Sequence, residues 1–228
     1  MAATQRAPFI VIEGLDRSGK TTQTSNLLVR LQKDGKDVQL IKFPDRTTPI
    51  GQMIDSYLRS ASELDDRAIH LLFSANRWEL ASTIEKLLNS GTTVICDRYA
   101  FSGIAFSASK VDASGHRLLS YEWCKSPDIG LPKPDIVLFL DITPEKARER
   151  GGYGEERYEK EEMQRRVRTN FEGIRKEMME LESKSQDHTL VWEVIDAGRS
   201  LEEVEQDIWS HIEPLYRSQC PSLGRLWK

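Results

Sequence analysis

The sequence predicts an α/β fold with three layers, in which helices cover both faces of a parallel five-stranded sheet. Three observations support this. β-rich runs alternate with helical segments along the chain, which is the pattern of βαβ units. The run Ile136–Leu140 is apolar at every position, as expected of a strand buried on both faces. A length of 228 residues, with 39% hydrophobic and 30% charged residues, is typical of one globular domain, which we expect to span residues 1–228.

Five short runs are expected to form the strands. Each is rich in β-branched or large apolar residues and is followed by residues that interrupt the run. Pro44, for example, follows the second run and cannot donate a hydrogen bond to a sheet. The expected strands are Phe9–Glu13, Asp37–Phe43, Thr92–Cys96, Ile136–Leu140 and Leu190–Ile195.

Helical segments separate these strands. In the first, Leu27, Leu28 and Leu31 recur at helical spacing, and Gly35 is expected to end the helix. Pro144 opens a later helix at a position where proline is tolerated. The expected helices are Lys20–Asp34, Ile50–Arg59, Asp65–Asn89, one starting at Pro144, Glu159–Lys184 and Leu201–Tyr216.

Composition argues against two kinds of partner. Lys and Arg number 32 and Asp and Glu 36, giving a net charge of −4 and a pI near 5.7. Nucleic-acid-binding domains are typically basic, so we expect no nucleic-acid partner. No apolar run approaches the roughly 18 residues of a membrane span, and the apolar run Phe9–Ile12 is too short for the core of a signal peptide. We therefore expect no membrane partner.

Cysteine usage predicts a reduced, intracellular protein. Cys96, Cys124 and Cys220 are far apart and form no C-x-x-C pair, and the four histidines show no metal-ligand spacing. We expect a cytoplasmic location, with the nucleus as the alternative.

A phosphate-binding motif follows the first expected strand. Residues 14–21 (GLDRSGKT) fit the pattern G-x-x-x-x-G-K-[ST]. Glycines allow the backbone to curl so that its N–H groups point at phosphate oxygens. Lys20 would reach the β- and γ-phosphates, and the Thr21 hydroxyl would bind Mg²⁺. A strand before the motif and a helix after it are the context that it requires, so the sequence predicts nucleotide binding.

A second polar group follows the third expected strand. Asp97-Arg98-Tyr99 starts where that strand ends, and ligands of parallel sheets bind beyond the carboxyl ends of the strands. Asp97 could hold Mg²⁺ through water, and Arg98 could pair with a phosphate. A simple salt bridge at the strand end is the alternative. Asp141 ends another strand, but Asp97 is the better candidate for metal support.

Two further segments could bind a second ligand. Phe73 and Arg77 are four residues apart and share a helix face, so the ring could stack on a base while the guanidinium donates to its carbonyls. Ordinary packing is the alternative for this pair. Arg46 follows the second strand and could hold another anionic group, or be a solvated charge.

A glycine-rich run, Gly151–Gly154, lies between two expected helices and is flanked by Arg148, Arg150 and Arg157. Phosphoryl transfer requires positioning, exclusion of water and positive charge on the moving group. We expect this run to be a mobile lid that carries arginine; a charged helix junction is the alternative.

Together these segments resemble the thymidylate kinases, nucleoside monophosphate kinases that make dTDP from dTMP and ATP. F-S-A-N-R-W and D-R-Y-x-x-S-G are specific to that family, whereas the phosphate-binding motif is shared with many others. The resemblance covers essentially the whole chain. It implies a P-loop kinase fold with a short lid at about residues 150–160, ATP and dTMP as substrates, Mg²⁺ as cofactor, and a homodimer. The matching segments are EGLDRSGKTTQ (13–23), KFPDRTTPIG (42–51), HLLFSANRWE (70–79), DRYAFSGIAFS (97–107), WCKSPDIGLPKPDIVLFLD (123–141), RGGYGEERYE (150–159) and LGRLWK (223–228).

The resemblance also implies roles for individual residues. The catalytic group would be Arg17, Lys20, Asp97 and Arg98. ATP would contact Gly14, Ser18, Gly19, Lys20, Thr21, Thr22, Arg150 and the backbone near Arg199. The dTMP site would contain Asp16, Phe43, Arg46, Phe73, Arg77, Arg98, Ser102, Gly103, Phe106 and Tyr158. Mg²⁺ would be served by Thr21 and Asp97, the latter through water.

Within the dTMP group, the implied roles are specific. Asp16 would contact the sugar 3′-hydroxyl, and Arg46 and Arg98 would hold the acceptor phosphate. Phe73 would stack on thymine while Arg77 donates to its O4.

Phe106 would crowd a ribose 2′-hydroxyl, and Tyr158 would approach the sugar. On the donor side, Arg17 would reach the transferring phosphate and Arg150 would lie against adenine.

The chain departs from the family pattern at two places. Residues 108–120 look longer than the usual connection, and Asp45 stands where a glutamate is expected before Arg46. Arginine is present both in the phosphate-binding loop and in the expected lid, so the sequence leaves open which one acts in catalysis.

Two other functions remain open at this point. One is a kinase for another acceptor, such as dUMP, dGMP, UMP or a nucleoside; a nucleoside kinase would not need the Arg46 and Arg98 pair. The other is a nucleotide-dependent switch, which would carry the guanine-binding pattern N-K-x-D that this sequence lacks.

Overall fold

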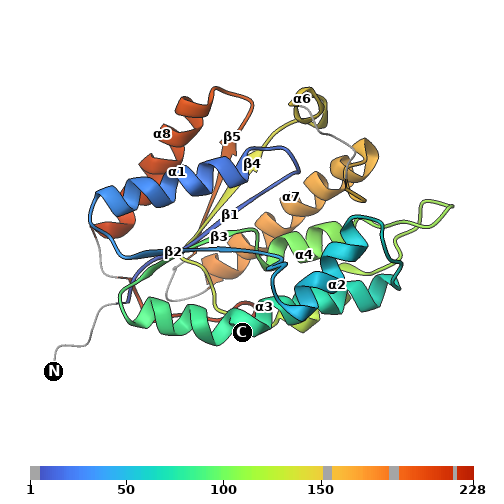
Figure 1. Ribbon diagram of the computed structural model, residues 1–228, viewed down its shortest axis with the longest axis horizontal. Helices are drawn as coiled ribbons and strands as arrows, with labels where there is room; N and C mark the ends of the chain where they lie inside the picture. Colours follow the sequence, from blue (N-terminus) through green and yellow to red (C-terminus); the bar gives the residue numbers. More distant parts are fainter. Residues whose placement is uncertain (1–5, 151–155, 185–189, 218–219) are drawn as a thin grey trace.

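The computed structural model describes residues 6–150, 156–184, 190–217 and 220–228. Its centre is a parallel sheet with the strand order β2-β3-β1-β4-β5 (Figure 1). The strands are β1 (Phe9–Gly14), β2 (Val38–Lys42), β3 (Thr93–Asp97), β4 (Ile136–Asp141) and β5 (Val191–Asp196). The predicted fold class is confirmed, and each predicted strand is present with neither end moved by more than one residue.

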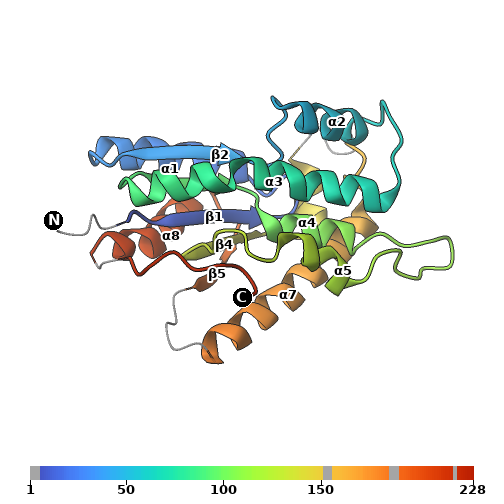
Figure 2. The same cartoon turned by 90° about the horizontal axis from the view of Figure 1, so that it is seen from below.

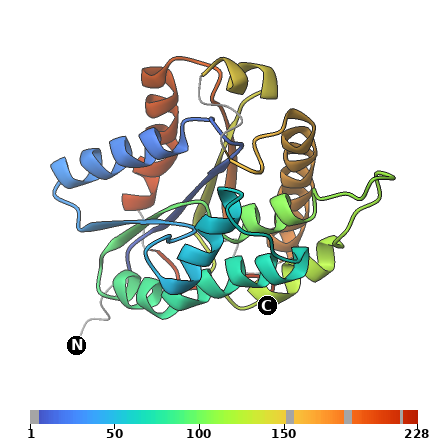
Figure 3. The same cartoon turned by 45° about the vertical axis from the view of Figure 1, so that its right-hand side comes forward.

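Helices cover both faces of the sheet. Figure 3 shows α1 and α8 on one face, with α3, α4 and α7 on the other. The predicted helices are observed as α1 (Lys20–Lys33), α2 (Pro49–Leu58), α3 (Asp66–Asn89), α6 (Pro144–Glu149), α7 (Glu161–Lys184) and α8 (Leu201–Ile212). The last one continues as a 3₁₀ turn, η2 (Glu213–Tyr216), in which Pro214 interrupts the α-helical hydrogen bonds.

The structure contains two further helices that were not predicted, α4 (Ala100–Ser107) and α5 (Tyr121–Lys125), and the turn η1 (Ser126–Asp128). Every residue of α4 is buried, so the helix has no polar face and its sequence has no helical periodicity. α5 is one turn long, too short to show a period. The connection between α4 and α5 extends away from the body of the molecule as a long loop (Figure 2).

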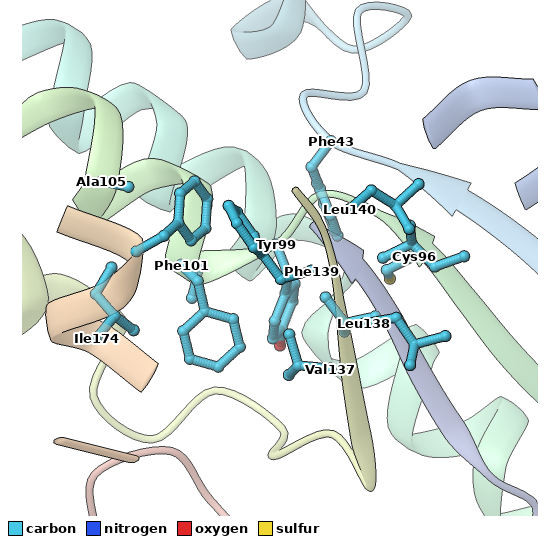
Figure 4. Close-up of a cluster of buried hydrophobic side chains, with 14 of the residues drawn as sticks. Phe43, Cys96, Tyr99, Phe101, Ala105, Val137, Leu138, Phe139, Leu140 and Ile174 are labelled. Atoms are coloured by element: carbon cyan, nitrogen blue, oxygen red, sulfur yellow. The ribbon is translucent and has the colours of Figure 1, made fainter. Parts of the chain in front are cut away.

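The core on the α4 side of the sheet is aromatic. Phe101 of α4 packs against Trp192 of β5, with ring centroids 4.9 Å apart, and Phe139 of β4 lies 4.7 Å from Phe171 of α7. Figure 4 shows Phe101 gathered with Phe139 and with Ile174 of α7. Large buried rings of this kind dominate core energetics and fix α4 and α7 against the sheet.

The register of the strands brings the predicted functional segments together. Gly14 pairs with Leu140, and Lys42 pairs with Asp97, so the carboxyl ends of β1, β2 and β3 lie at one edge. The phosphate-binding loop follows β1 there, and Asp97 ends β3. This edge is where ligands of parallel sheets bind.

The described residues limit what the structure says about two predictions, the lid and the absence of a membrane span. The glycine-rich run Gly151–Gly154, expected to be a mobile lid, lies outside them. In the part that is described, no helix has the length and apolar character needed to span a membrane. Cys96 is buried in β3, as expected of a core thiol.

Candidate active site

A cavity of about 500 Å³ opens at the carboxyl edge of the sheet. It joins the phosphate-binding loop to the ends of β2 and β3, to α3 and α4, and to the residues before α7. Most of the residues predicted for function line it together: Asp16, Arg17, Gly19, Lys20, Thr21, Thr22, Phe43, Arg46, Phe73, Arg77, Asp97, Arg98, Ser102, Gly103, Phe106, Arg150 and Tyr158.

The phosphate-binding loop has the curled backbone that its glycines predict. Gly19 precedes α1 with a φ of 91°, in the left-handed region that favours glycine. A Cβ atom on Gly14 would lie 2.6 Å from the Leu140 carbonyl oxygen, so the close approach of β1 and β4 also requires glycine there. The N-terminal end of α1 points at this loop, where its unpaired N–H groups and dipole favour an anion.

Lys20 is buried at the base of the loop. Its Nζ donates to the Leu15 carbonyl at 2.5 Å and lies 3.4 Å from Ser18 Oγ. Burial, and then the nearby Arg98 guanidinium, lower the pKa of Lys20 to about 7. A phosphate beside Nζ would restore the charged form, because opposite charge favours it.

Thr21 and Asp97 form an oxygen pair at the mouth of the cavity. Thr21 Oγ1 donates to Asp97 Oδ2 at 2.9 Å, and Lys42 Nζ lies 3.9 Å from the same carboxylate. A hydroxyl and a carboxylate suit Mg²⁺, which keeps several waters and takes its remaining oxygens from substrate phosphates. Among the described residues, no group of three or more His, Cys, Asp or Glu side chains could hold a metal ion without further ligands. The rival Asp141 is instead paired with Arg168 at 2.6 Å.

Arg98 is held in the cavity by its own hydrogen bonds and, through Ser102, by Glu13. Arg98 has a φ of 68°, and its Nη1 donates to the Gly14 carbonyl and to Ser102 Oγ, both at 3.1 Å. Its Nη2 pairs with Asp16. Glu13 is fully buried and accepts hydrogen bonds from the backbone N–H groups of Tyr99 and Ser102 at 2.9 and 3.0 Å. Burial raises the pKa of Glu13.

Two cavity arginines are paired with carboxylates from the segment that precedes α7. Arg46 Nη2 lies 2.9 Å from Glu156, and its Nη1 lies 2.6 Å from Asp55. Arg17 Nε lies 3.0 Å from Glu159.

Gln164 of α7 connects the same region to the phosphate-binding loop. Its Nε2 donates to Asp16 Oδ2 at 2.7 Å and to the Tyr158 carbonyl at 2.9 Å, and its Oε1 accepts from the Asp16 N–H at 3.2 Å. Gln164 therefore fixes both backbone and side chain of Asp16.

The far wall of the cavity is aromatic and carries one buried guanidinium. Phe73 and Arg77 come from α3, and Phe106 of α4 packs against Tyr158 with ring centroids 5.7 Å apart. A Cβ on Gly103 would lie 2.7 Å from Arg77 Nη2, so glycine is required for Arg77 to reach the cavity. This wall can stack a planar base and donate a hydrogen bond to its edge.

Three predicted residues lie outside the lining. Gly14 and Ser18 belong to the phosphate-binding loop but do not line the cavity, and Ser18 Oγ contacts Lys20 Nζ. Arg199 pairs with Asp207 and donates to the Asp196 carbonyl at 3.1 Å, so its side chain points away from the cavity. Arg150 links the phosphate-binding loop to the turn after β5, because it donates to the carbonyl of Arg17, at 3.1 Å, and to that of Ala197.

Of the two other arginines expected in the lid, neither lines the cavity. Arg148 is largely exposed near Glu161, and Arg157 pairs with Glu63 and donates to the Tyr57 carbonyl at 2.9 Å.

Several residues of the site were missed in the sequence. Glu13 was predicted only as the end of a strand. Its position directly before the phosphate-binding motif could have marked it as part of the site. Gln164 was hidden in a long charged helix. The remaining missed residues are Lys42, Asp128, Glu156 and Glu159, which carried no distinguishing pattern.

The fold and the cavity define a nucleotide-binding phosphotransferase of the P-loop class. A phosphate-binding loop at the start of a helix faces a second pocket with its own arginines and a base-sized aromatic wall, so one cavity can hold a phosphate donor and a nucleotide acceptor.

Comparison with known proteins identifies the particular family. A family model described as thymidylate kinase matches residues 12–208. The chain is 45% identical over 225 residues to a thymidylate kinase of Danio rerio, covering 98% of this chain and 99% of that protein. It is 51% identical over 208 residues to one of Schizosaccharomyces pombe, covering 91% and 92%. The solved thymidylate kinase of Candida albicans superposes with a TM-score of 0.80 at 40% identity, covering 96% of this chain and 98% of that one. The chain belongs to the thymidylate kinase family, whose members phosphorylate dTMP to dTDP with ATP.

The lowered pKa of Lys20 predicts that ATP binding takes up a proton. At pH 8 a lysine with a pKa of about 7 is roughly nine-tenths neutral, and the phosphates of ATP return it to the charged form. Titration calorimetry of Mg-ATP, without acceptor, in buffers of different ionisation enthalpy should give an uptake approaching one proton per ATP.

Lys20→Arg is the matched control, because arginine stays charged at every accessible pH. The uptake should vanish in this variant. An equal uptake in both proteins, or none in the wild type, would contradict the assignment to Lys20.

Proposed function

We propose that this chain catalyses in-line transfer of the ATP γ-phosphoryl group to the 5′-phosphate of dTMP. The observation that carries the proposal is the juxtaposition of two anion sites in one cavity. Lys20 and the loop amides line the cavity together with Arg46 and Arg98, and Arg98 binds the loop at the Gly14 carbonyl and at Asp16. Two phosphate groups can be brought together there because cations on both sides offset their repulsion.

On the acceptor side, Arg46 and Arg98 would hold the dTMP phosphate. Arginine suits this role because its planar fork matches phosphate oxygens. The acceptor phosphate is already a nucleophile at neutral pH, so the reaction requires no strong base. Asp16, fixed by Gln164, would accept from the sugar 3′-hydroxyl.

For the base, the cavity offers stacking and a donor. Phe73 would stack on thymine, and Arg77 would donate to O4. Phe106 and Tyr158 close the sugar side of the pocket with their packed rings, so Phe106 would exclude a ribose 2′-hydroxyl.

On the donor side, Lys20 and the amides of residues 14–21 would hold the ATP phosphates, and Thr21 and Asp97 would hold Mg²⁺, Asp97 through water. When bound, Mg²⁺ neutralises charge on the phosphates. Thr22 and Arg150 would contact the nucleotide where the cavity opens.

Between the two arginines left open by the sequence, geometry favours Arg17 as the one that acts on the transferring group. Both arginines line the cavity, but Arg17 belongs to the phosphate-binding loop itself, where its φ is 63° and its Nε pairs with Glu159 at 3.0 Å. Arg150 is engaged with two backbone carbonyls, including that of Arg17, and so supports the loop.

A panel of monophosphates tests the proposed function. With Mg-ATP, dTMP should give rapid formation of dTDP and ADP, dUMP should react more slowly, and dGMP, dCMP, UMP and AMP should give little product. Turnover of another monophosphate but not of dTMP would support the kinase activity and contradict the assignment of the base pocket to thymine. ATP hydrolysis that no monophosphate stimulates would favour the nucleotide-dependent switch.

Arg17→Gly should lower kcat by about 10³ or more while changing the KM for dTMP little, because an arginine supplied to the transition state contributes mainly to the rate. Glycine is the appropriate replacement because the backbone φ is 63°. Steady-state kinetics measures both parameters, and Arg217→Gly on the exposed surface is the control. A raised KM with kcat intact would make Arg17 a binding residue, and a larger loss of kcat in Arg150→Ala would make the lid arginine the catalytic one.

We also propose that the chain forms a homodimer through the outer face of α3. Leu71 and Trp78, two turns apart, are 48% and 42% exposed on this helix, and Ala75 lies between them. Contiguous apolar surface of this kind marks interaction sites. Trp78 Nε1 donates to the Pro127 carbonyl at 2.8 Å, and Ile129, two residues further along the same segment, is 40% exposed.

Light scattering should therefore give a mass of twice 26.1 kDa for the wild type and one chain mass for Leu71→Glu. Val29→Glu, at an equally exposed apolar residue on α1, should remain dimeric. A monomeric wild type, or a dimer that survives Leu71→Glu, would contradict this interface.

A further inference from the structure

A buried ion pair lies directly behind the base pocket. Arg77 of α3 and Asp128 of η1 are 51 residues apart in sequence, and their side chains are 3% and 0% exposed. Arg77 Nη2 donates to Asp128 Oδ2 at 2.6 Å, and Nε donates to Oδ1 at 3.2 Å. The carboxylate therefore engages one edge of the guanidinium with two roughly parallel hydrogen bonds, the geometry that fixes an arginine best.

This fork leaves a defined part of Arg77 for a ligand. Nη1 makes no hydrogen bond to the described residues, and Arg77 lines the cavity. The backbone of Gly103 closes the other side, because a Cβ there would lie 2.7 Å from Nη2 and 2.9 Å from Nη1. The two hydrogen bonds and the close approach of Gly103 therefore set the orientation of the guanidinium, and Nη1 can donate a hydrogen bond but cannot accept one.

We propose that Asp128 is a positioning residue that sets base selectivity. By holding Nε and Nη2, it directs Nη1 at the edge of the base. There Nη1 can donate to a carbonyl oxygen, whereas an exocyclic amino group offers it no acceptor. It also neutralises the charge of Arg77, so this guanidinium does not turn toward the substrate phosphates in the same cavity. The inference rests on the proposed function, in which Arg77 faces the thymine.

Asp128 is itself held in place from three directions. Ser74 Oγ donates to Oδ1 at 2.7 Å, which ties the carboxylate to the same helix as Arg77. Trp78 Nε1 donates to the carbonyl of the preceding residue, Pro127. The segment after it pairs with the end of the chain, where Gly130 N donates to the Leu226 carbonyl at 3.0 Å and Leu226 N donates to Leu131 at 2.9 Å.

A purely structural ion pair would behave differently from a positioning one. A structural pair would hold α3 against η1, and its loss would alter stability and every kinetic parameter of the folded enzyme alike. A positioning pair acts through Arg77. Its loss would therefore change the selectivity for the base and leave the binding of ATP unchanged.

The experiment is a cycle of Asp128→Asn, Arg77→Ala and the double variant. For each, kcat and KM are measured with dTMP and with dCMP, together with the KM for ATP and the melting temperature. Asp128→Asn should raise the KM for dTMP about tenfold and lower the ratio of kcat/KM for dTMP over dCMP by about the same factor, as expected when a buried hydrogen-bond arrangement is lost. The KM for ATP should not change, and in the Arg77→Ala background Asp128→Asn should have no further effect on selectivity.

Ser74→Ala is the matched control, because it removes a hydrogen bond to the same carboxylate and leaves the fork to Arg77 intact. Because Ser74 is one of several contacts that hold Asp128, this variant should lower selectivity far less than Asp128→Asn does. If Asp128→Asn does not fold, Arg77→Lys provides the test, since lysine keeps the positive charge but cannot form the fork. It should lose selectivity as Asp128→Asn would.

Three results would overturn the inference: unchanged selectivity in Asp128→Asn or Arg77→Lys, an equal rise of the KM values for ATP and dTMP, or an effect of Asp128→Asn on selectivity that persists without Arg77. Each is distinguishable from failure of the proposed function, in which the wild type itself would not phosphorylate dTMP.

Discussion

The site depends on one electrostatic constraint, which is the crowding of positive charge. Two phosphate-bearing substrates can meet in a cavity only if cations surround them, and these cations must also be held close together when no phosphate is present. Burial lowers the pKa of Lys20, and the nearby Arg98 lowers it further, so crowding of charge contributes to this shift. Each arginine that lines the cavity has a carboxylate or carbonyl partner: Arg17 with Glu159, Arg46 with Asp55 and Glu156, Arg77 with Asp128, Arg98 with Asp16, and Arg150 with two carbonyls.

The parallel sheet determines where these charges meet. Because every strand of the sheet runs the same way, the loops after β1, β2 and β3 share one edge. The phosphate-binding loop, Arg46 and Asp97 thereby converge from segments far apart in sequence. Glu13 links this edge to α4, since it binds two N–H groups at the start of that helix and so positions Ser102 beside Arg98. The aromatic packing of Phe101 and Phe139 holds α4 and β4 in place behind the site.

The sequence predicted the fold and most of the cavity lining because these depend on local patterns. A fully apolar run marks a buried strand, and spaced glycines mark a phosphate-binding loop. The missed features depend on contacts across the fold. α4 is buried on all sides and has no periodic pattern, and Gln164 is one polar residue in a charged helix until the fold places it against Asp16. The backbone near Arg199 was assigned to ATP by resemblance; its side chain pairs with Asp207, and the backbone contact stays a prediction.

The partners of the cavity arginines separate them into two kinds. Arg46 and Arg98 pair with carboxylates that are 19–37% exposed (Asp55, Glu156 and Asp16), so solvent screens these pairs and a phosphate can compete for the guanidinium. Arg77 and Asp128 are buried together, and removing either partner would leave an uncompensated buried charge. A substrate phosphate therefore cannot replace Asp128 as the partner of Arg77. The first kind suits a site that must bind and release a phosphate in every cycle, and the second suits a fixed donor that reads a neutral base. For Arg46, Arg77 and Arg98, the burial of both partners together therefore distinguishes the two functions. Arg17 pairs with the buried Glu159, but its own side chain is 32% exposed and stays accessible to a phosphate.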